Sequence, residues 1–294
     1  MSAAAGARQP AAIARAGRRS ARPPVRTVYR WELRKLVSQK RTYLGFGLGA
    51  VLPLAFVIVQ LLRNHGPHGG DSIFFSEITQ SGLVTPVLML IFLSAFMLPV
   101  IAALVAGDIV ANEDGNGTLK TILTRSVDRG QVFTAKTLAA MSYAAIALYI
   151  SAAVGTIAGL AAWGFHGIVT LSGSKVSASE ALLLIVAGNA CYLIPLFAVV
   201  SIGILLSTST RNSAAAVVAT IGIVILLYIL AQIPGLESLR PYILTEQFQA
   251  WQGLLRTPTY WKPILHSIWV CALYAAPALF AAYLVFLRRD VAGG

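Results

Sequence analysis

Charged residues are scarce in this sequence. Of its 294 residues 12% are charged and 57% are hydrophobic, and the mean hydropathy is +0.73. Soluble domains carry roughly 25% charge, so the composition predicts an integral membrane protein. Acids are the rarer sign, with 11 Asp and Glu against 23 Lys and Arg and a net charge of +12. Such an excess would suggest nucleic acid in a soluble chain, but aromatic residues are not interleaved with the basic cluster, and we expect no nucleic-acid partner.

Several chemical signatures are missing as well. The dipeptide Gly-Lys does not occur, so no G-x-x-x-x-G-K-[ST] phosphate loop exists, and any ATP must bind to another polypeptide. Neither H-E-x-x-H nor G-x-S-x-G is present, and we expect no catalytic residue, metal or cofactor in this chain. His65 and His68 lie in a segment rich in glycine and proline, which favours a loop over a metal site. Cys191 and Cys271 lie in apolar runs, which favours a role in packing over a disulfide.

Six apolar runs are each long enough to cross a bilayer. Each has about 20 residues, which as a helix spans a hydrocarbon core of ~30 Å. None contains Asp, Glu, Lys or Arg, and this disfavours an ion-coupled carrier, because intramembrane charges usually mark ion pathways. The sequence therefore predicts an all-α membrane protein with a six-helix transmembrane domain over residues 42–287. The predicted spans are 42–62, 82–106, 137–165, 181–206, 213–233 and 264–287.

Prolines and glycines inside these runs predict local features of the helices. Prolines are tolerated in membrane helices and usually produce kinks. Gly155 and Gly159 form a G-x-x-x-G pair, which predicts close helix packing, within one subunit more often than between two. The prolines inside spans are Pro53, Pro86, Pro99, Pro195 and Pro277.

Lys and Arg sort to one side of the predicted membrane. If both termini are inside, 18 of the 23 lie in inside segments and five lie outside. The positive-inside rule therefore places both termini and the segment 107–136 in the cytoplasm. Residues 1–26 form an Ala/Arg/Pro-rich stretch, for which we expect a disordered basic tail in the cytoplasm. We expect the protein as a whole to lie in the inner membrane of a bacterial cell. Residues 288–294 form a second cytoplasmic tail.

Residues 27–41 have the pattern of an amphipathic helix. Tyr29, Leu33, Leu36 and Val37 share one face, while most basic residues lie elsewhere. This favours a helix in the headgroup layer, with Trp31 as its interfacial anchor. The alternative is a plain basic flank to the first span.

The polar segment 107–136 separates the second and third runs. It contains four acids and four bases, a density of acids that indicates a site of protein contact. Thr118 is a fair N-cap, after which Leu119, Ile122 and Leu123 share one helical face. The pattern predicts a short amphipathic helix at a membrane surface. The alternative is a solvated connector, whose charges only keep the segment out of the bilayer.

The order of residues in this segment resembles the loop between helices two and three of ABC-2-type permeases, the membrane subunits of ATP-driven exporters. The resemblance rests on Glu113, Gly117-Thr118-Leu119, Leu123-Thr124, Arg129 and Lys136, and with the six-span layout it extends over roughly residues 27–290. Ser126 stands where proline is usual in that pattern. The resemblance implies a permease that pairs with a second copy, a homodimer, and with two separate ATPase subunits that bind ATP and Mg.

The resemblance also implies roles for individual residues. The segment would be a coupling helix, in which Glu113 and Asp114 hold basic groups of the ATPase and apolar residues fill its groove. Arg125 and Arg129 would pair with acids of the ATPase or with anionic headgroups. The full set of predicted coupling residues is Glu113, Asp114, Gly117, Thr118, Leu119, Ile122, Leu123, Arg125 and Arg129.

Polar side chains inside the spans are weak candidates for a substrate path. Each is equally well explained by interhelical hydrogen bonding, worth roughly 0.6–2 kcal/mol. We expect a small amphiphilic or lipid-like substrate, because the predicted outside loops are short. The candidates are Gln60, Thr85, Ser94, Asn189, Tyr192 and Tyr228.

The last outside segment, 234–263, is rich in aromatic residues and proline. The pattern of residues 244–255 predicts a short helix at or in the outer leaflet, and the resemblance implies a re-entrant helix.

Two other functions stay open for the whole chain. One is a carrier or intramembrane enzyme that works alone, and the other is a structural anchor for a cytoplasmic partner.

Overall fold

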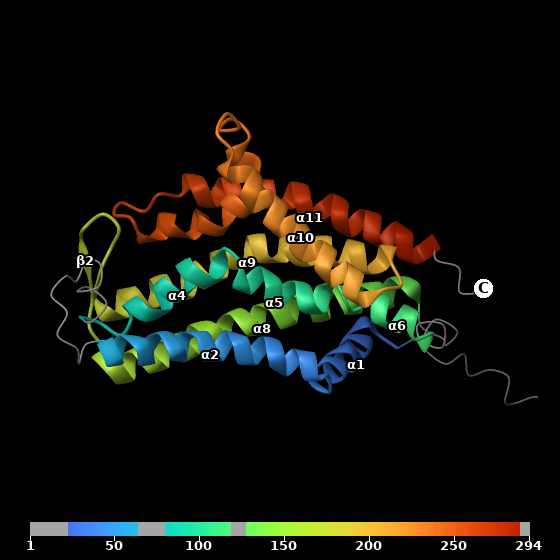
Figure 1. Cartoon of the computed structure of the whole chain (residues 1–294), viewed down its shortest axis with the longest axis horizontal. Coiled ribbons are helices and arrows are strands. Elements are labelled where there is room, and N and C mark those ends of the chain that lie inside the picture. Colours follow the sequence, from blue (N-terminus) through green and yellow to red (C-terminus); the bar gives the residue numbers. More distant parts are fainter. Residues whose placement is uncertain (1–22, 64–79, 119–127, 289–294) are drawn as a thin grey trace, which may run out of the picture.

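The computed structural model describes residues 23–63, 80–118 and 128–288, and about 80% of them are helical. The long helices run side by side along the longest axis of the molecule (Figure 1). The α-helices are α1 Val25–Val37, α2 Lys40–Arg63, α4 Val84–Ser94, α5 Met97–Ala106, α6 Ala111–Gly115, α8 Arg129–Trp163, α9 Ala178–Ser209, α10 Ser213–Gln232 and α11 Lys262–Arg288. Two 3₁₀ helices, η2 Arg240–Tyr242 and η3 Leu244–Leu255, and a hairpin of β1 Ile168–Val169 with β2 Lys175–Val176 complete the described elements.

The all-α class is confirmed, and the number of long apolar helices agrees with a multi-pass membrane protein. Five unbroken helices, α2, α8, α9, α10 and α11, are long and apolar enough to cross a membrane, and α4 with α5 makes a sixth candidate. The predicted span 82–106 is divided between α4 and the helix that follows it, which are bent by 61°, and Pro99 is one of the prolines for which a kink was predicted. Nothing in the described part of the chain tests whether the tails 1–26 and 288–294 are disordered, since most of each lies outside it.

The break in this span has a local cause. Pro99 has no N–H for the carbonyl of Ala95, and its ring collides with that carbonyl in a regular helix. Phe96 accordingly leaves helical geometry, with φ −138° and ψ −53°. The Tyr192 hydroxyl of α9 donates a hydrogen bond of 2.8 Å to the carbonyl of Ser94, beside the break. By contrast Pro53, Pro195 and Pro277 stand inside continuous helices.

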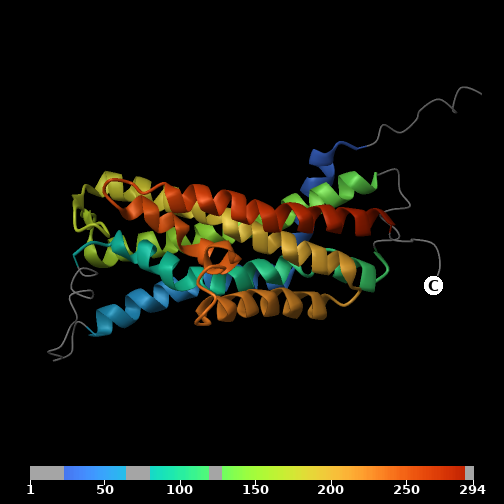
Figure 2. The same ribbon diagram turned by 90° about the horizontal axis from the view of Figure 1, so that it is seen from above.

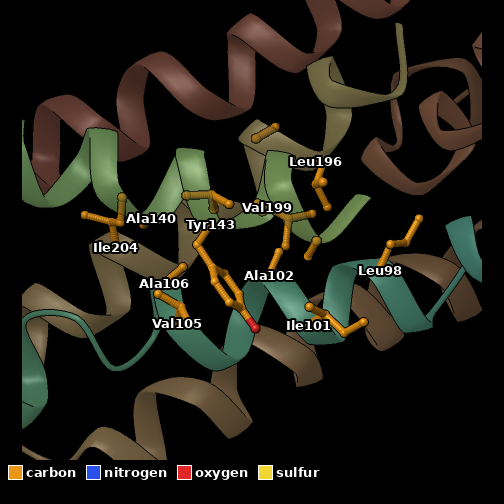
Figure 3. Close-up of a cluster of buried hydrophobic side chains, with 14 of the residues drawn as sticks. Leu98, Ile101, Ala102, Val105, Ala106, Ala140, Tyr143, Leu196, Val199 and Ile204 are labelled. Atoms are coloured by element: carbon orange, nitrogen blue, oxygen red, sulfur yellow. The ribbon is translucent and has the colours of Figure 1, made fainter. Parts of the chain in front are cut away.

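The core lies where α5, α8 and α9 meet. Tyr143 of α8 points from its helix toward Ile101 and Val105 of α5 (Figure 3), and its ring stacks on Phe46 of α2 with centroids 5.1 Å apart. Its hydroxyl lies directly over Gly45, where no side chain would fit. These contacts bury Tyr143 to 2% exposure and join α2 to the centre of the bundle.

The G-x-x-x-G pair is used inside the chain, as expected. A Cβ added to Gly159 of α8 would collide with the backbone carbonyl of Gly82 and with the side chain of Thr85. At Gly155 the same addition would meet Pro53 at an ordinary 3.5 Å. Gly159 is thus the position that lets α8 and the start of α4 approach closely.

The predicted outer helix exists with the predicted bounds, but it is a 3₁₀ helix packed inside the protein. Leu244, Phe248 and Trp251 of η3 are buried against α9 and α11, and the rings of Phe248 and Tyr192 are 5.8 Å apart. The segment before η3 is tied to α11 by a contact of 2.9 Å between the His266 ring and the Pro241 carbonyl.

The segments that we predicted to be cytoplasmic gather at one end of the bundle. Figures 1 and 2 show α1, α6 and the C-terminal end of α11 at that end, with the β-hairpin at the opposite end. Arg129, at the start of α8, donates a hydrogen bond of 2.7 Å to the carbonyl of Leu287 near the end of α11.

Candidate functional site

The short helix α6 forms part of the polar segment between the bent span and α8. Its start is held by the Ser207 hydroxyl of α9, which accepts hydrogen bonds from the backbone N–H groups of Val110 (3.1 Å) and Ala111 (3.0 Å). Glycines allow close approach on both sides of it, because a Cβ would lie 2.8 Å from the backbone of Val217 at Gly107 and 2.7 Å from the Arg211 carbonyl at Gly115. α6 is therefore fixed against the turn between α9 and α10.

Four charged side chains from three helices meet beside α6 and form a closed ring of ion pairs, which we call the charge ring. Lys35 of α1 contacts Glu32 of α1 at 3.0 Å and Glu113 of α6 at 2.8 Å. Lys136 of α8 contacts the other oxygens of the same two carboxylates, at 3.0 Å for Glu32 and 2.7 Å for Glu113. Each lysine thus bridges both glutamates, and the ring joins α1, α6 and α8.

Burial differs sharply around the charge ring. The side chain of Lys136 is 1% exposed, whereas those of Glu32, Glu113 and Lys35 are 5%, 15% and 40% exposed. Lys136 also donates a hydrogen bond of 3.2 Å to the carbonyl of Ile109. Buried charges are tolerated when they are paired and hydrogen-bonded, and the two positive and two negative charges cancel here.

The ring also stabilises the ionised states of Glu113 and Lys35. Burial alone raises the pKa of Glu113, but the attraction of Lys136 and then of Lys35 outweighs it, and the pKa lies below its ordinary value. Burial alone lowers the pKa of Lys35, but Glu113 and then Glu32 outweigh it, and the pKa lies above its ordinary value. Both groups are therefore charged at neutral pH.

The other acids of the polar segment are also engaged within the chain. Asp108 pairs with Arg41 at the start of α2 and accepts a hydrogen bond from Ser213 of α10. Asp114 pairs with Arg211 at 3.3 Å, in the turn before α10. Asp128 caps α8 by accepting from the N–H of Gly130 at 3.2 Å, and the Gln131 side chain completes the capping box.

These contacts give the predicted coupling residues a role inside the chain. Glu113 and Asp114, which we expected to hold basic groups of an ATPase, both take their bases from α1, α8 and the turn before α10. Gly117 has φ +70°, and Thr118 donates 3.1 Å to the Glu113 carbonyl. Leu119, Ile122, Leu123 and Arg125 lie outside the described residues. Binding to an ATPase stays a prediction.

The amphipathic helix at residues 27–41 is present as α1, but its apolar face does not lie where we expected. Leu36 is buried and Leu33 half-buried against the bundle, so these two side chains contact protein, and a position of α1 in the headgroup layer stays a prediction. Val37, placed on the same face from the sequence, is 59% exposed. Trp31 is 46% exposed, as an interfacial anchor requires.

The predicted substrate-path residues are buried except Tyr228, which is 47% exposed. Tyr192 and Ser94 meet at the break in the second span, where the Ser94 hydroxyl donates 3.0 Å to the Ile91 carbonyl. The Asn189 amide donates 2.8 Å to the Ile185 carbonyl of its own helix and lines a narrow cavity between α4, α5, α8 and α9. Thr85 lies against Gly159 of α8, and a path through the predicted residues stays a prediction.

Sequence reasoning missed Glu32 and Lys35 as site residues. A signal was present, because Val28, Glu32 and Leu36 follow at a spacing of four, which places one acid in the middle of an apolar helical stripe.

In the described part of the chain no group of three or more His, Cys, Asp or Glu side chains could hold a metal.

Comparison with known proteins identifies a family without naming an activity. No curated protein matches the chain. The family described as "Protein of unknown function (DUF2705)" matches residues 51–292, which include α6, Lys136 and all the candidate spans from α4 onward. The chain therefore belongs to the DUF2705 family.

Proposed function

We propose that this protein is the permease subunit of an ATP-driven exporter of the ABC-2 type. It lies in the inner membrane of a bacterial cell with both termini in the cytoplasm, pairs with a second copy, and works with two separate ATPase subunits that bind ATP and Mg. The residue pattern around Glu113 supports this proposal, as do five or six apolar helices and the gathering of the basic segments at one end of the bundle.

The observation that carries the proposal is the set of ion pairs around α6. Glu113 connects α6 to α1 and α8, while Asp108 connects the preceding turn to α2 and α10. Asp114 adds a contact to the turn between α9 and α10. A force applied by an ATPase at residues 119–127 would therefore reach five helices at once.

The same contacts divide the roles within the polar segment. Glu113 and Asp114 are occupied by bases of this chain, so in our proposal they transmit the motion of the segment to the spans. Leu119, Ile122, Leu123 and Arg125 would supply the contact with the ATPase. The bent span, which leads directly into α6, would change its angle when the segment moves. The transported compound would be small and amphiphilic or lipid-like.

The experiment is purification of the affinity-tagged chain from its native host, with identification of the proteins that accompany it. We expect a roughly equimolar ATPase, with ATP-dependent transport after reconstitution into vesicles. Glu113→Lys places a third positive charge between Lys35 and Lys136, and it should abolish transport while the ATPase is still recovered. Glu237→Lys makes the same charge change at a fully exposed position of the predicted outside segment, and it should leave both unchanged.

The outcomes separate the proposals. If Glu113→Lys loses the ATPase itself, then Glu113 serves in docking and not in transmission. If Glu113→Lys leaves assembly and transport untouched, the coupling role is refuted. A chain that is recovered alone and transports without ATP would be a carrier that works by itself.

A further inference from the structure

Helix α1 presents two faces with different chemistry. The face toward the bundle packs on α8 and contains Val28, Glu32 and Leu36, all less than 9% exposed. Positions four residues apart share a face of a helix, and Arg26, Arg30 and Arg34 follow at that spacing on the opposite side. All three arginines are exposed. We call these three residues the arginine face.

The arginine face has no counter-charge within the described part of the chain. No ion pair or side-chain hydrogen bond engages these three guanidinium groups there. The one acid of α1 is Glu32, and it lies on the other side of the helix in the charge ring. Three positive charges on one helical face, with no acid of the described residues beside them, attract a partner that carries negative charge.

The location of α1 identifies this partner as a membrane surface. α1 ends at Val37 and the first candidate span begins at Lys40, so the helix sits at the end of an apolar run. Figures 1 and 2 show that α1 crosses the direction of the long helices instead of continuing it. Trp31, 46% exposed, lies beside the arginines, and tryptophan concentrates at the membrane–water interface.

We propose that the arginine face of α1 binds the headgroups of anionic phospholipids. Of the apolar side chains predicted to enter the bilayer, Tyr29, Leu33 and Leu36 pack against the bundle and only Val37 stays exposed, so the remaining attraction is mainly electrostatic. A planar guanidinium donates two parallel hydrogen bonds to a phosphate. This inference holds whether or not an ATPase partner exists, because it depends only on the position of α1 beside the membrane.

The test is the affinity of the full chain for single lipids. The delipidated protein in a neutral detergent is titrated with phosphatidylglycerol or with phosphatidylcholine of the same acyl chains, and bound lipids are counted by native mass spectrometry. We expect phosphatidylglycerol to bind more tightly. Each Arg→Gln change should weaken it about fivefold, the usual effect of one basic residue near an anionic surface. Arg26→Gln/Arg30→Gln/Arg34→Gln should leave little preference over phosphatidylcholine.

Two control variants localise the effect. Arg26→Lys/Arg30→Lys/Arg34→Lys keeps the charge and should retain most of the preference. Lys175→Gln/Arg256→Gln/Lys262→Gln removes three exposed charges from the predicted outside segments and should retain all of it. The single Arg→Gln variants give the same test if the triple variant does not fold.

Either of two results would overturn the inference. One is an unchanged preference for phosphatidylglycerol after the arginine face is removed, including the case in which the same variant loses a co-purifying acidic protein. The other is an equal loss of preference in the Lys175/Arg256/Lys262 variant, which would indicate a general effect of net charge.

Discussion

Lys136→Met tests whether the charge ring is as important to the fold as its burial implies. The change removes a side chain that is 1% exposed and contacts both Glu32 and Glu113. Methionine keeps a long, flexible, apolar chain in the same space. The two carboxylates then share one counter-charge, Lys35, and a net negative charge stays buried.

The expected loss of stability follows from these distances. Two unit charges 3 Å apart interact by about 5 kcal/mol at an effective dielectric constant of ~20, and Lys136 makes two such contacts. Part of this is offset because the lysine no longer has to be dehydrated. Removal of one partner from a buried ion pair typically costs about 3–5 kcal/mol, and we expect Lys136→Met to fall in that range.

Lys35→Met is the matched control. Lys35 bridges the same two carboxylates at 2.8 and 3.0 Å, but its side chain is 40% exposed. Solvent screens such a contact, so its removal should cost about 1 kcal/mol or less. Glu32→Gln combined with Lys136→Met removes one charge of each sign, and the pair should be less destabilising than the sum of the single changes by about 1–3 kcal/mol.

The assay is reversible unfolding in mixed micelles with increasing dodecyl sulfate, followed by the fluorescence of the five tryptophans. The reasoning would be refuted if Lys136→Met and Lys35→Met cost the same, because burial would then not determine the strength of these ion pairs. Additive effects of Glu32→Gln and Lys136→Met would equally refute direct pairing.

Three further predictions concern single contacts. The pKa of Glu113 is lower in the folded chain than its ordinary 4.5, so the unfolded chain binds more protons between the two values. The stability that Glu113 contributes is therefore present above pH 4.5 and lost as the pH falls through the folded pKa. Unfolding measured as a function of pH should show this loss, and the Glu113→Gln variant should lack it. Gly159→Ala places a methyl group against the Gly82 carbonyl and should cost about 1–3 kcal/mol by the same unfolding assay, whereas Gly47→Ala, with nothing within 4 Å, should be neutral. Tyr192→Phe leaves the Ser94 carbonyl beside the broken span without its donor and should cost about 1–3 kcal/mol, and an unchanged midpoint would mean that this hydrogen bond is not needed at the break.

Much of the fold could be predicted because membrane helices obey one-dimensional rules. Length and hydropathy were sufficient for α2, α8, α9, α10 and α11, whose bounds agree with the predicted spans to within about eight residues at each end. Length says nothing about continuity, however. Pro99 indicated a kink, but a bend of 61° depends also on α9, which supplies the hydrogen bond to Ser94.

The charge ring could not be predicted because its members are far apart in the sequence. Glu113 is separated from Lys35 by 78 positions, and Lys136 from Glu32 by 104. A dense cluster of acids indicated a contact with protein, but the same composition fits an external partner and an internal one. Only the packing of α1 on α8 decides for the internal one. The spacing of Val28, Glu32 and Leu36 marks a buried face on α1, but it does not identify the helix that covers this face.

This pairing also determines the charge that the basic end of the molecule presents outward. The five acids in the described part of this end are Glu32, Asp108, Glu113, Asp114 and Asp128. Four of them form ion pairs with bases of the chain, and the fifth caps α8. With these acids engaged by other groups of the chain, the arginine face of α1 carries positive charge that no acid of the described residues opposes. The contacts that hold α6 to the bundle therefore also make the outer surface of α1 attractive to anions.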